Sequence, residues 1–292
     1  MKDWVFKSKN GTEIGILELG DLASETVVFY IHGFPGCRKE AFAALKVAQK
    51  YHIRLIAIDR AGYGNSTFIK DRKVIDFPAT ITEIADALEI KTFSILGVSG
   101  GASYTAACAK FIPNRLDKVY IVSGVSPLDG AAVFDGMIFI NKLFLKAGRI
   151  FPKCTTAIVY VVASLWKNSS TLMFYWLKTF MSKGDKDLLE SKMKKDTSVA
   201  TPINEGLKNG VRGAAKDFEL LCREWGFALD SIEIPVSIWH GEDDCYVPIA
   251  MGRYNAEKIP HSKFKAIPEG GHLMVFDVLD EIFQEIAPDN RY

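Results

Sequence analysis

The sequence has no excess of either charge and no apolar run long enough to cross a membrane. Its 292 residues contain 36 lysines and arginines against 35 aspartates and glutamates, which gives a formal net charge of +1. Nucleic-acid binding needs a basic face that neutralises many phosphates, and the composition gives no sign of one. The apolar stretch 154–166 ends at Lys167, short of the roughly 20 residues that span a bilayer. We therefore expect neither a nucleic-acid partner nor a membrane span.

Cysteine is scarce, and the motifs of common cofactor and metal sites are missing. The five cysteines are odd in number, widely spaced and without a CxxC pair, which favours reduced thiols over a disulfide framework or a zinc site. Residues 1–7 lack the apolar core and cleavage site of a secretory signal. No GxxxxGKS/T, HExxH or dinucleotide-binding GxGxxG motif is present. We expect a cytoplasmic protein with no metal and no cofactor.

Strand-like and helix-like segments alternate over the first 124 residues. Apolar and β-branched runs predict buried strands, and apolar residues at helical spacing predict the helices between them. The strands are 13–19, 26–31, 53–58, 93–98 and 118–122, and the helices are 40–50, 81–88 (with Thr80 as its cap) and 102–111. This alternation indicates a mostly parallel sheet with helices on both faces.

The alternation stops between residues 126 and 232. That stretch shows no convincing buried strand, only helical segments rich in aromatic and aliphatic residues. The earlier pattern then returns with a strand at 235–239, a helix at 249–258, a strand at 263–267 and a helix at 277–286. We expect one α/β core domain of residues 1–125 and 233–292, interrupted by a helical insertion of residues 126–232.

The first chemical motif is Gly-Val-Ser-Gly-Gly at residues 97–101, between the predicted strand 93–98 and the predicted helix 102–111. A serine on so tight a strand-to-helix turn is held in a strained conformation that exposes its hydroxyl. Gly97 and Gly101 are needed because a Cβ at either position would clash with neighbouring chain. The N-terminus of the following helix also offers free N–H groups to an oxyanion. We expect Ser99 to be a nucleophile.

A second motif, His-Gly-Phe-Pro-Gly at residues 32–36, directly follows the predicted strand 26–31. Acyl transfer needs two donors that converge on the developing oxyanion, and removing one typically costs about 10²–10³ in rate. The Gly100 N–H, one residue past the serine, is the first candidate. Pro35 has no N–H, so the Phe34 N–H is the natural second donor.

A serine nucleophile also needs an imidazole that takes its proton and a carboxylate that holds the imidazole. Among the five histidines, His272 alone lies late in the chain, after a predicted strand and on a Gly-Gly turn. The segment 240–248 follows the preceding strand and contains two adjacent acids, Asp243 and Asp244. The chain order serine, aspartate, histidine is the order expected of hydrolases with such a serine turn.

With these motifs in place, the chain resembles the α/β-hydrolase fold superfamily over nearly its whole length. The helical insertion corresponds to the cap that such enzymes carry after the sixth strand. Residues 59–66 (DRAGYGNS) resemble the family's D-R-x-G-x-G-x-S turn, which is mainly structural. Residues 241–248 resemble the family's acid motif, and this resemblance selects Asp244 over Asp243.

The resemblance implies a serine hydrolase with a catalytic triad and an oxyanion hole. The expected triad is Ser99, Asp244 and His272, and the expected oxyanion donors are Phe34 and Gly100. Haloalkane dehalogenases and epoxide hydrolases of this fold use an aspartate at the elbow, so the serine excludes them. We expect hydrolysis of a small carboxylic ester, or of a related acyl substrate, through an acyl-enzyme intermediate.

Two alternatives stay open. The motifs 97–101 and 32–36 resemble those of proline iminopeptidases, although that family has glycine in place of Phe34 and D-Q-R-G in place of residues 59–62. Such peptidases bind the substrate's free amine with glutamates of the cap, and the insertion contains Glu190, Glu205, Glu219 and Glu224. Other proteins that resemble this superfamily keep the triad but act as small-molecule receptors or signalling partners.

Aromatic residues are frequent in the insertion and predict an apolar roof over the site. They include Phe134, Phe139, Phe144, Phe151, Trp166, Phe174, Trp176 and Phe180. Ligand pockets are lined mainly by apolar and aromatic side chains. We therefore expect the partner to be a small-molecule substrate with an apolar acyl group.

Overall fold

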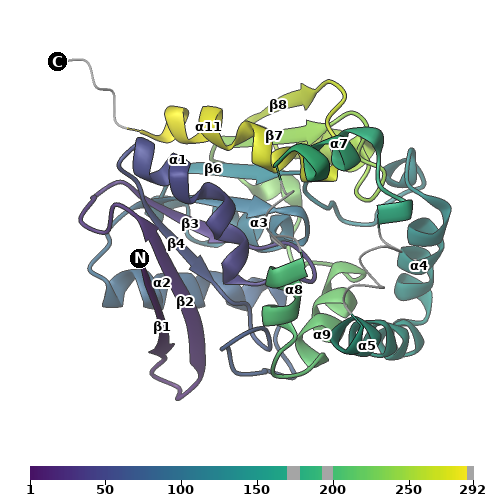
Figure 1. The fold of residues 1–292 in the computed structure, drawn as a ribbon, viewed down its shortest axis with the longest axis horizontal. Helices are drawn as coiled ribbons and strands as arrows, with labels where there is room; N and C mark the ends of the chain where they lie inside the picture. Colours follow the sequence, from purple (N-terminus) through teal and green to yellow (C-terminus); the bar gives the residue numbers. More distant parts are fainter. Residues whose placement is uncertain (170–177, 193–199, 288–292) are drawn as a thin grey trace.

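The computed structural model describes residues 1–169, 178–192 and 200–287. Its frame is one eight-stranded sheet with the order β1-β2-β4-β3-β5-β6-β7-β8 (Figure 1). The strand β2 (Glu13–Gly20) pairs antiparallel with β1 (Lys2–Lys7) and with β4 (Arg54–Ile58). The other pairs are parallel and involve β3 (Val27–Ile31), β5 (Phe93–Val98), β6 (Leu116–Val122), β7 (Val236–Gly241) and β8 (Ser262–Ile267). The predicted, mostly parallel α/β sheet is confirmed.

The predicted strands agree with β2 to β8 to within a few residues, because these strands carry long apolar runs. Every residue of β3 and of β5 is buried. No strand is predicted for residues 1–7, which is wrong, because β1 occupies this segment. In β1 only Trp4 and Phe6 are half-buried, and they alternate with exposed residues, so this edge strand gives a pattern too short to stand out.

Helices cover both faces of the sheet (Figure 1). On one face lie α1 (Leu45–Lys50) and α11 (Val275–Ile286), which share a buried apolar cluster. On the other face lie α2 (Phe77–Ala87), α3 (Ala102–Phe111) and α10 (Ile249–Lys258). The doubly covered sheet explains why its central strands are apolar on both sides.

Two predicted helix starts are wrong. Residues 38–44 form a 3₁₀ helix, so α1 covers only the second part of the predicted helix 40–50. The helix α2 begins at Phe77 rather than at Ile81, with Pro78 in its first turn, where a missing N–H costs no hydrogen bond. Thr80 therefore lies inside α2 and is not its cap.

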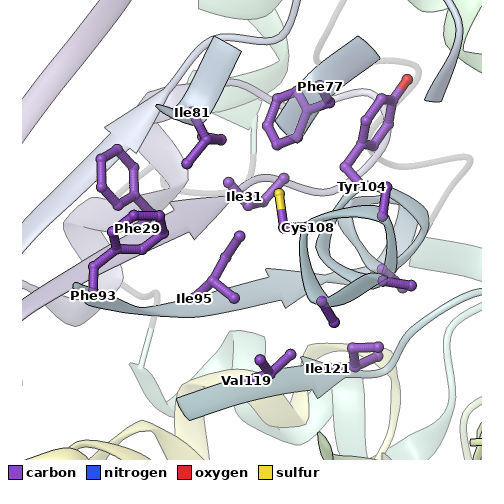
Figure 2. Packing of buried hydrophobic residues seen from close by; sticks show 14 of the residues in the cluster. Phe29, Ile31, Phe77, Ile81, Phe93, Ile95, Tyr104, Cys108, Val119 and Ile121 are labelled. Carbon is purple, nitrogen blue, oxygen red and sulfur yellow. The ribbon is translucent and has the colours of Figure 1, made fainter. Parts of the chain in front are cut away.

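The core is built from alternate residues of neighbouring strands. Figure 2 shows Phe29 of β3 beside Phe93 of β5, with ring centroids 4.6 Å apart. Tyr104 and Cys108 of α3 reach toward the same cluster (Figure 2). The intervening residues, such as Tyr30, face the opposite cluster under α1 and α11. This packing fixes the ends of the central strands, where the chemical motifs lie.

Helices fill the chain between β6 and β7. They are α4 (Phe139–Ile150), α5 (Pro152–Asn168), α7 (Lys183–Lys192), α8 (Ala200–Gly206) and α9 (Arg212–Leu221). Within the described part of this segment there is no strand, as predicted. Figure 1 shows these helices beyond the ends to which the parallel strands point. Nowhere in the described ranges is a helix long and apolar enough to cross a bilayer.

A buried charge cluster joins α9 to the sheet. Asp217 of α9 accepts hydrogen bonds from Arg60 (2.6 and 2.9 Å), Arg72 (2.5 Å) and the Tyr104 hydroxyl (2.7 Å). Burial alone would raise the pKa of Asp217, but the two guanidinium groups hold it well below its usual range. A carboxylate so paired fixes α9 above the strand ends.

Candidate active site

Ser99 occupies a strained turn directly after β5. Its φ of 53° lies in the left-handed region, which a residue with a Cβ rarely adopts; such a conformation typically costs about 1–3 kcal/mol. A Cβ at Gly97 would collide with Thr105 Oγ1, and one at Gly101 would collide with the Ile31 carbonyl oxygen. These two glycines let the strand and helix approach closely enough to hold the serine in this conformation.

His272 and Asp244 lie in a hydrogen-bonded row with Ser99. His272 Nε2 is 3.0 Å from Ser99 Oγ, and His272 Nδ1 is 2.7 Å from Asp244 Oδ2. The other carboxylate oxygen of Asp244 accepts the N–H groups of Tyr246 (3.0 Å) and Val247 (2.9 Å). Because the Asp244 carboxylate cannot donate, His272 Nδ1 carries the proton of the hydrogen bond between them. His272 Nε2 is therefore free to accept the serine proton.

The geometry distinguishes the two adjacent acids. Asp243 is exposed, and its N–H donates to the Gly270 carbonyl (2.9 Å), whereas Asp244 is buried. A second histidine, His240, lies 3.6 Å from Asp244 Oδ2, but its Nε2 donates to the Val247 carbonyl (2.7 Å). Burial lowers the pKa of His240, so this histidine is neutral. It therefore does not compete with His272 for an ion pair with the Asp244 carboxylate.

The pKa of His272 is raised above its ordinary value. Burial by itself lowers the pKa, but the charge and hydrogen bond of Asp244 outweigh that effect, and two further carboxylates, Asp185 and Glu40, add to it. The imidazole is thus a stronger base than a free histidine, as a proton acceptor for an alcohol requires.

The loop after β3 faces the serine turn. A Cβ built on Gly100 would be 2.9 Å from Phe34 Cβ and 3.3 Å from Phe34 N, so the two backbones are in contact. Arg60 fixes the loop by donating to the His32 carbonyl and to the Gly33 carbonyl (3.1 Å). Within the described chain, the Phe34 N–H has no acceptor. A free donor beside the Gly100 backbone is what an oxyanion hole needs.

Glu40 also touches this loop, from the 3₁₀ helix 38–44. Its Oε2 accepts the Gly33 N–H at 2.8 Å. Burial raises the pKa of Glu40 to about 7, although the Gly33 hydrogen bond and the charges of Arg60 and His272 oppose the rise. A second group that titrates near neutral pH therefore lies within electrostatic reach of the imidazole.

Asp185 links α7, one of the helices between β6 and β7, to the segment after β8 that carries His272 and Leu273, which we call the histidine loop. The side chain comes from α7, is almost completely buried, and accepts the backbone N–H groups of His272 (3.0 Å) and Leu273 (2.7 Å). Its own N–H donates to Ser182 Oγ (3.1 Å). The Asp185 carboxylate therefore fixes the backbone at His272, and it places a negative charge near the imidazole ring.

Apolar side chains surround the serine turn. Leu221 of α9 is 3.5 Å from the Cβ position of Gly100. Phe218 of α9 lies 6.1 Å from the Phe34 ring and 4.5 Å from the Phe144 ring of α4, measured between centroids. These contacts put α9 next to the candidate oxyanion donors.

The aromatic residues expected to form the roof have different surroundings in the structure. Of the eight aromatic residues, Phe144 has the contact with α9 just described. Phe139 and Phe151 are 77% and 61% exposed. Phe174 and Trp176 lie outside the described residues.

Sequence reasoning finds the serine, the histidine and the acid but misses Glu40 and Asp185. Both touch the site through contacts distant in sequence, and neither stands in a motif. The one local signal is that Asp185 is the first acidic residue after Asp135. In the described chain, no group of three or more His, Cys, Asp or Glu could hold a metal ion.

The chain belongs to the alpha/beta hydrolase fold family, whose model matches residues 26–278. Membership of this family makes it an enzyme of the hydrolase type, as the sequence analysis expects.

Similar proteins support this assignment at low identity. The chain is 26% identical to a bifunctional esterase/perhydrolase from Acinetobacter calcoaceticus, over 91% of this chain and 92% of the relative. It is 24% identical to a non-heme chloroperoxidase from Kitasatospora aureofaciens, over 91% and 90%. A bromoperoxidase structure from Bacillus anthracis superimposes with a TM-score of 0.71 at 20% identity, covering 98% of this chain and 99% of that one. A thermophilic esterase from Thermogutta terrifontis gives 0.68 at 17% identity, covering 98% and 97%.

Proposed function

We propose that this enzyme hydrolyses small carboxylic esters, with Ser99 as nucleophile, His272 as general base and Asp244 as the acid that orients the base. The observation that carries the proposal is the hydrogen-bonded row from Ser99 Oγ to the Asp244 carboxylate, at 3.0 and 2.7 Å. The names of two relatives, which contain the word esterase, also support it.

The reaction would proceed in two acyl-transfer steps. Ser99 Oγ attacks the ester carbonyl while His272 Nε2 takes the hydroxyl proton, and the N–H groups of Phe34 and Gly100 stabilise the oxyanion. Collapse of this intermediate breaks the ester C–O bond, and His272 returns the proton to the departing alcohol. Water then attacks the acyl-serine by the same route, releasing the carboxylic acid and restoring the serine.

We further propose that residues 126–232 form a cap over the core of residues 1–125 and 233–292, and that α9 lines the acyl site. Phe218 and Leu221 support this because both lie close to the proposed oxyanion donors. Burying one methylene of an acyl chain contributes about 0.8 kcal/mol, or roughly fourfold in kcat/KM. Apolar acyl groups longer than acetyl should therefore be preferred.

The aminopeptidase alternative finds less support. Three of the four glutamates already have cationic partners: Glu190 pairs with Lys178, Glu205 with Arg38, Lys39 and Lys208, and Glu219 with Lys216 and Arg223. Glu224 is exposed. In contrast, the acyl transfer of ester hydrolysis needs no partner for a free amine, only the hydrogen-bonded Ser99, His272 and Asp244 and the oxyanion donors.

The test is a series of p-nitrophenyl esters from acetyl to hexanoyl, assayed beside prolyl and alanyl amides with free amines. We expect kcat/KM to rise along the ester series and the amides to react far more slowly. A flat or falling series would refute the apolar acyl site. A preference for free-amine amides would favour the aminopeptidase, and binding without turnover would favour a receptor.

Hydrogen peroxide belongs in the same assay as a second acyl acceptor, because one relative is named both esterase and perhydrolase. Attack of peroxide on the acyl-serine would give a peracid in place of the acid. Peracid formation that depends on Ser99 would show that both acceptors share one intermediate.

A further inference from the structure

One segment of the chain contains several basic residues and no acidic residue. Between Asp135 and Asp185 the sequence contains seven basic residues: Lys142, Lys146, Arg149, Lys153, Lys167, Lys178 and Lys183. The whole chain has a net charge of only +1, so the remainder is acidic overall. The helices α4 and α5 lie within this basic segment.

The solvent-exposed face of the helix α5 is apolar. Its inner face, which includes Val159 and Trp166, is buried. Its outer face carries Ile158, Val161 and Leu165, which are 49%, 56% and 52% exposed. A surface helix of a water-soluble domain normally carries polar residues on its outer face, and a helix that is apolar all round is normally covered.

The helix α4 extends the same kind of surface. Phe139 and Leu143 of α4 are exposed, and so are Ile150 and Phe151 at the junction with α5. Figure 1 shows α4 and α5 at the outer edge of the molecule, at the end away from β1. The helices α4 and α5 pack against each other, and exposed apolar side chains gathered on neighbouring helices are typical of an interaction surface.

Basic side chains border these apolar residues. Lys146 on α4 and Lys153 on α5 are exposed. Arg149 is exposed as well, and it lies 3.6 Å from Asp129, an acid outside the basic segment. Apolar side chains flanked by lysine and arginine are the pattern of helices that lie in the interface of an anionic membrane.

We propose that the exposed faces of α4 and α5 dock on an anionic lipid bilayer, with the apolar side chains in the interface and the lysines against lipid phosphates. A second copy of the chain fits this surface less well, because a two-fold contact would bring the two basic segments together. The interaction is peripheral, and it needs no helix that crosses the bilayer.

The docking surface also adjoins the candidate active site. Phe144 of α4 contacts Phe218 of α9, which in turn contacts Phe34 in the proposed oxyanion loop. If the proposed ester hydrolysis is correct, a docked enzyme would meet acyl substrates that partition into the membrane. Vesicle binding itself does not depend on that chemistry, so the two proposals can fail separately.

The experiment is co-sedimentation of the full chain with vesicles of phosphatidylcholine alone and of phosphatidylcholine mixed with phosphatidylserine. We expect binding to the mixed vesicles that weakens as the salt concentration rises. Replacing Lys146 and Lys153 by glutamine should lower the partition coefficient roughly 30-fold, at about 1 kcal/mol per charge. The triple variant Ile158→Gln, Val161→Gln, Leu165→Gln should lower it at least about tenfold. These residues lie outside the proposed site, so hydrolysis of a water-soluble ester should be unchanged.

Matched controls replace exposed residues elsewhere: Leu22→Gln with Ile69→Gln for the apolar set, and Lys70→Gln with Lys263→Gln for the basic set. Equal losses in test and control variants would overturn the proposal, as would wild-type protein that binds neither kind of vesicle. Wild-type dimers in analytical ultracentrifugation that the triple variant abolishes, without any vesicle binding, would assign the surface to a second copy instead.

Discussion

Replacing Asp185 by asparagine should impair catalysis without unfolding the protein. The carboxylate accepts the N–H groups of His272 and Leu273 at 3.0 and 2.7 Å, and a hydrogen bond to a charged group contributes about 1.5–3 kcal/mol. Asparagine keeps one acceptor oxygen but turns an amide N–H toward the second backbone donor. We expect the histidine loop to shift and kcat to fall about 10- to 100-fold, since a displacement near 1 Å can cost about 10² in rate.

The pH profile separates this role from simple loss of structure. The negative charge of Asp185 is one of the groups that raise the pKa of His272. Removing that charge favours the neutral imidazole, so the pKa falls and the acidic limb of kcat/KM moves to lower pH. Asp187→Asn is the matched control, because Asp187 is exposed on the same helix. An unchanged kcat together with an unmoved acidic limb in Asp185→Asn would refute the reasoning.

Four further predictions concern single substitutions and pH. Asp244→Asn should lower kcat about 10⁴-fold, whereas Asp243→Asn should stay within about tenfold; steady-state ester kinetics would expose the reverse order. Asp217→Asn should destabilise the fold by about 3–5 kcal/mol, because it leaves two buried arginines underpaired, and urea unfolding that shows no change would contradict this. In wild type, kcat/KM should rise with pH through a midpoint above the ordinary histidine value of about 6.5, because only the neutral imidazole of His272 accepts a proton. Glu40→Gln should shift that midpoint to lower pH, and a midpoint that stays in place would disprove the coupling.

The fold and the proximity of Ser99, Asp244 and His272 follow from local signals in the sequence. Apolar runs define the parallel strands, and the carboxyl ends of such strands meet at one edge of the sheet. Ser99, Asp244 and His272 each lie just after a strand, so the sequence predicts that they lie close together. The strand–turn–helix context also predicts a strained conformation for the serine, and the structure shows that this conformation is left-handed.

Other features depend on contacts between residues distant in sequence, which no local pattern predicts. Glu40 is predicted to lie at the start of a helix, and Asp185 comes from α7, one of the helices between β6 and β7. The edge strand 2–7 has only two half-buried residues, so its pairing with β2 decides its conformation. The net charge of the whole chain is close to zero, so composition alone does not indicate the basic segment between residues 135 and 185. A cytoplasmic location stays a prediction.

We propose Ser99 as the nucleophile that becomes acylated. The most direct measurement is intact-protein and peptide mass spectrometry after treatment with a fluorophosphonate, on wild type and on Ser99→Ala. Wild type should gain one phosphonyl group on the peptide that contains Ser99 and lose ester hydrolysis in proportion. Ser99→Ala should remain unlabelled and lose several powers of ten in kcat while keeping the wild-type melting temperature. Label on another residue, or more than about a tenth of the activity left in Ser99→Ala, would contradict the account.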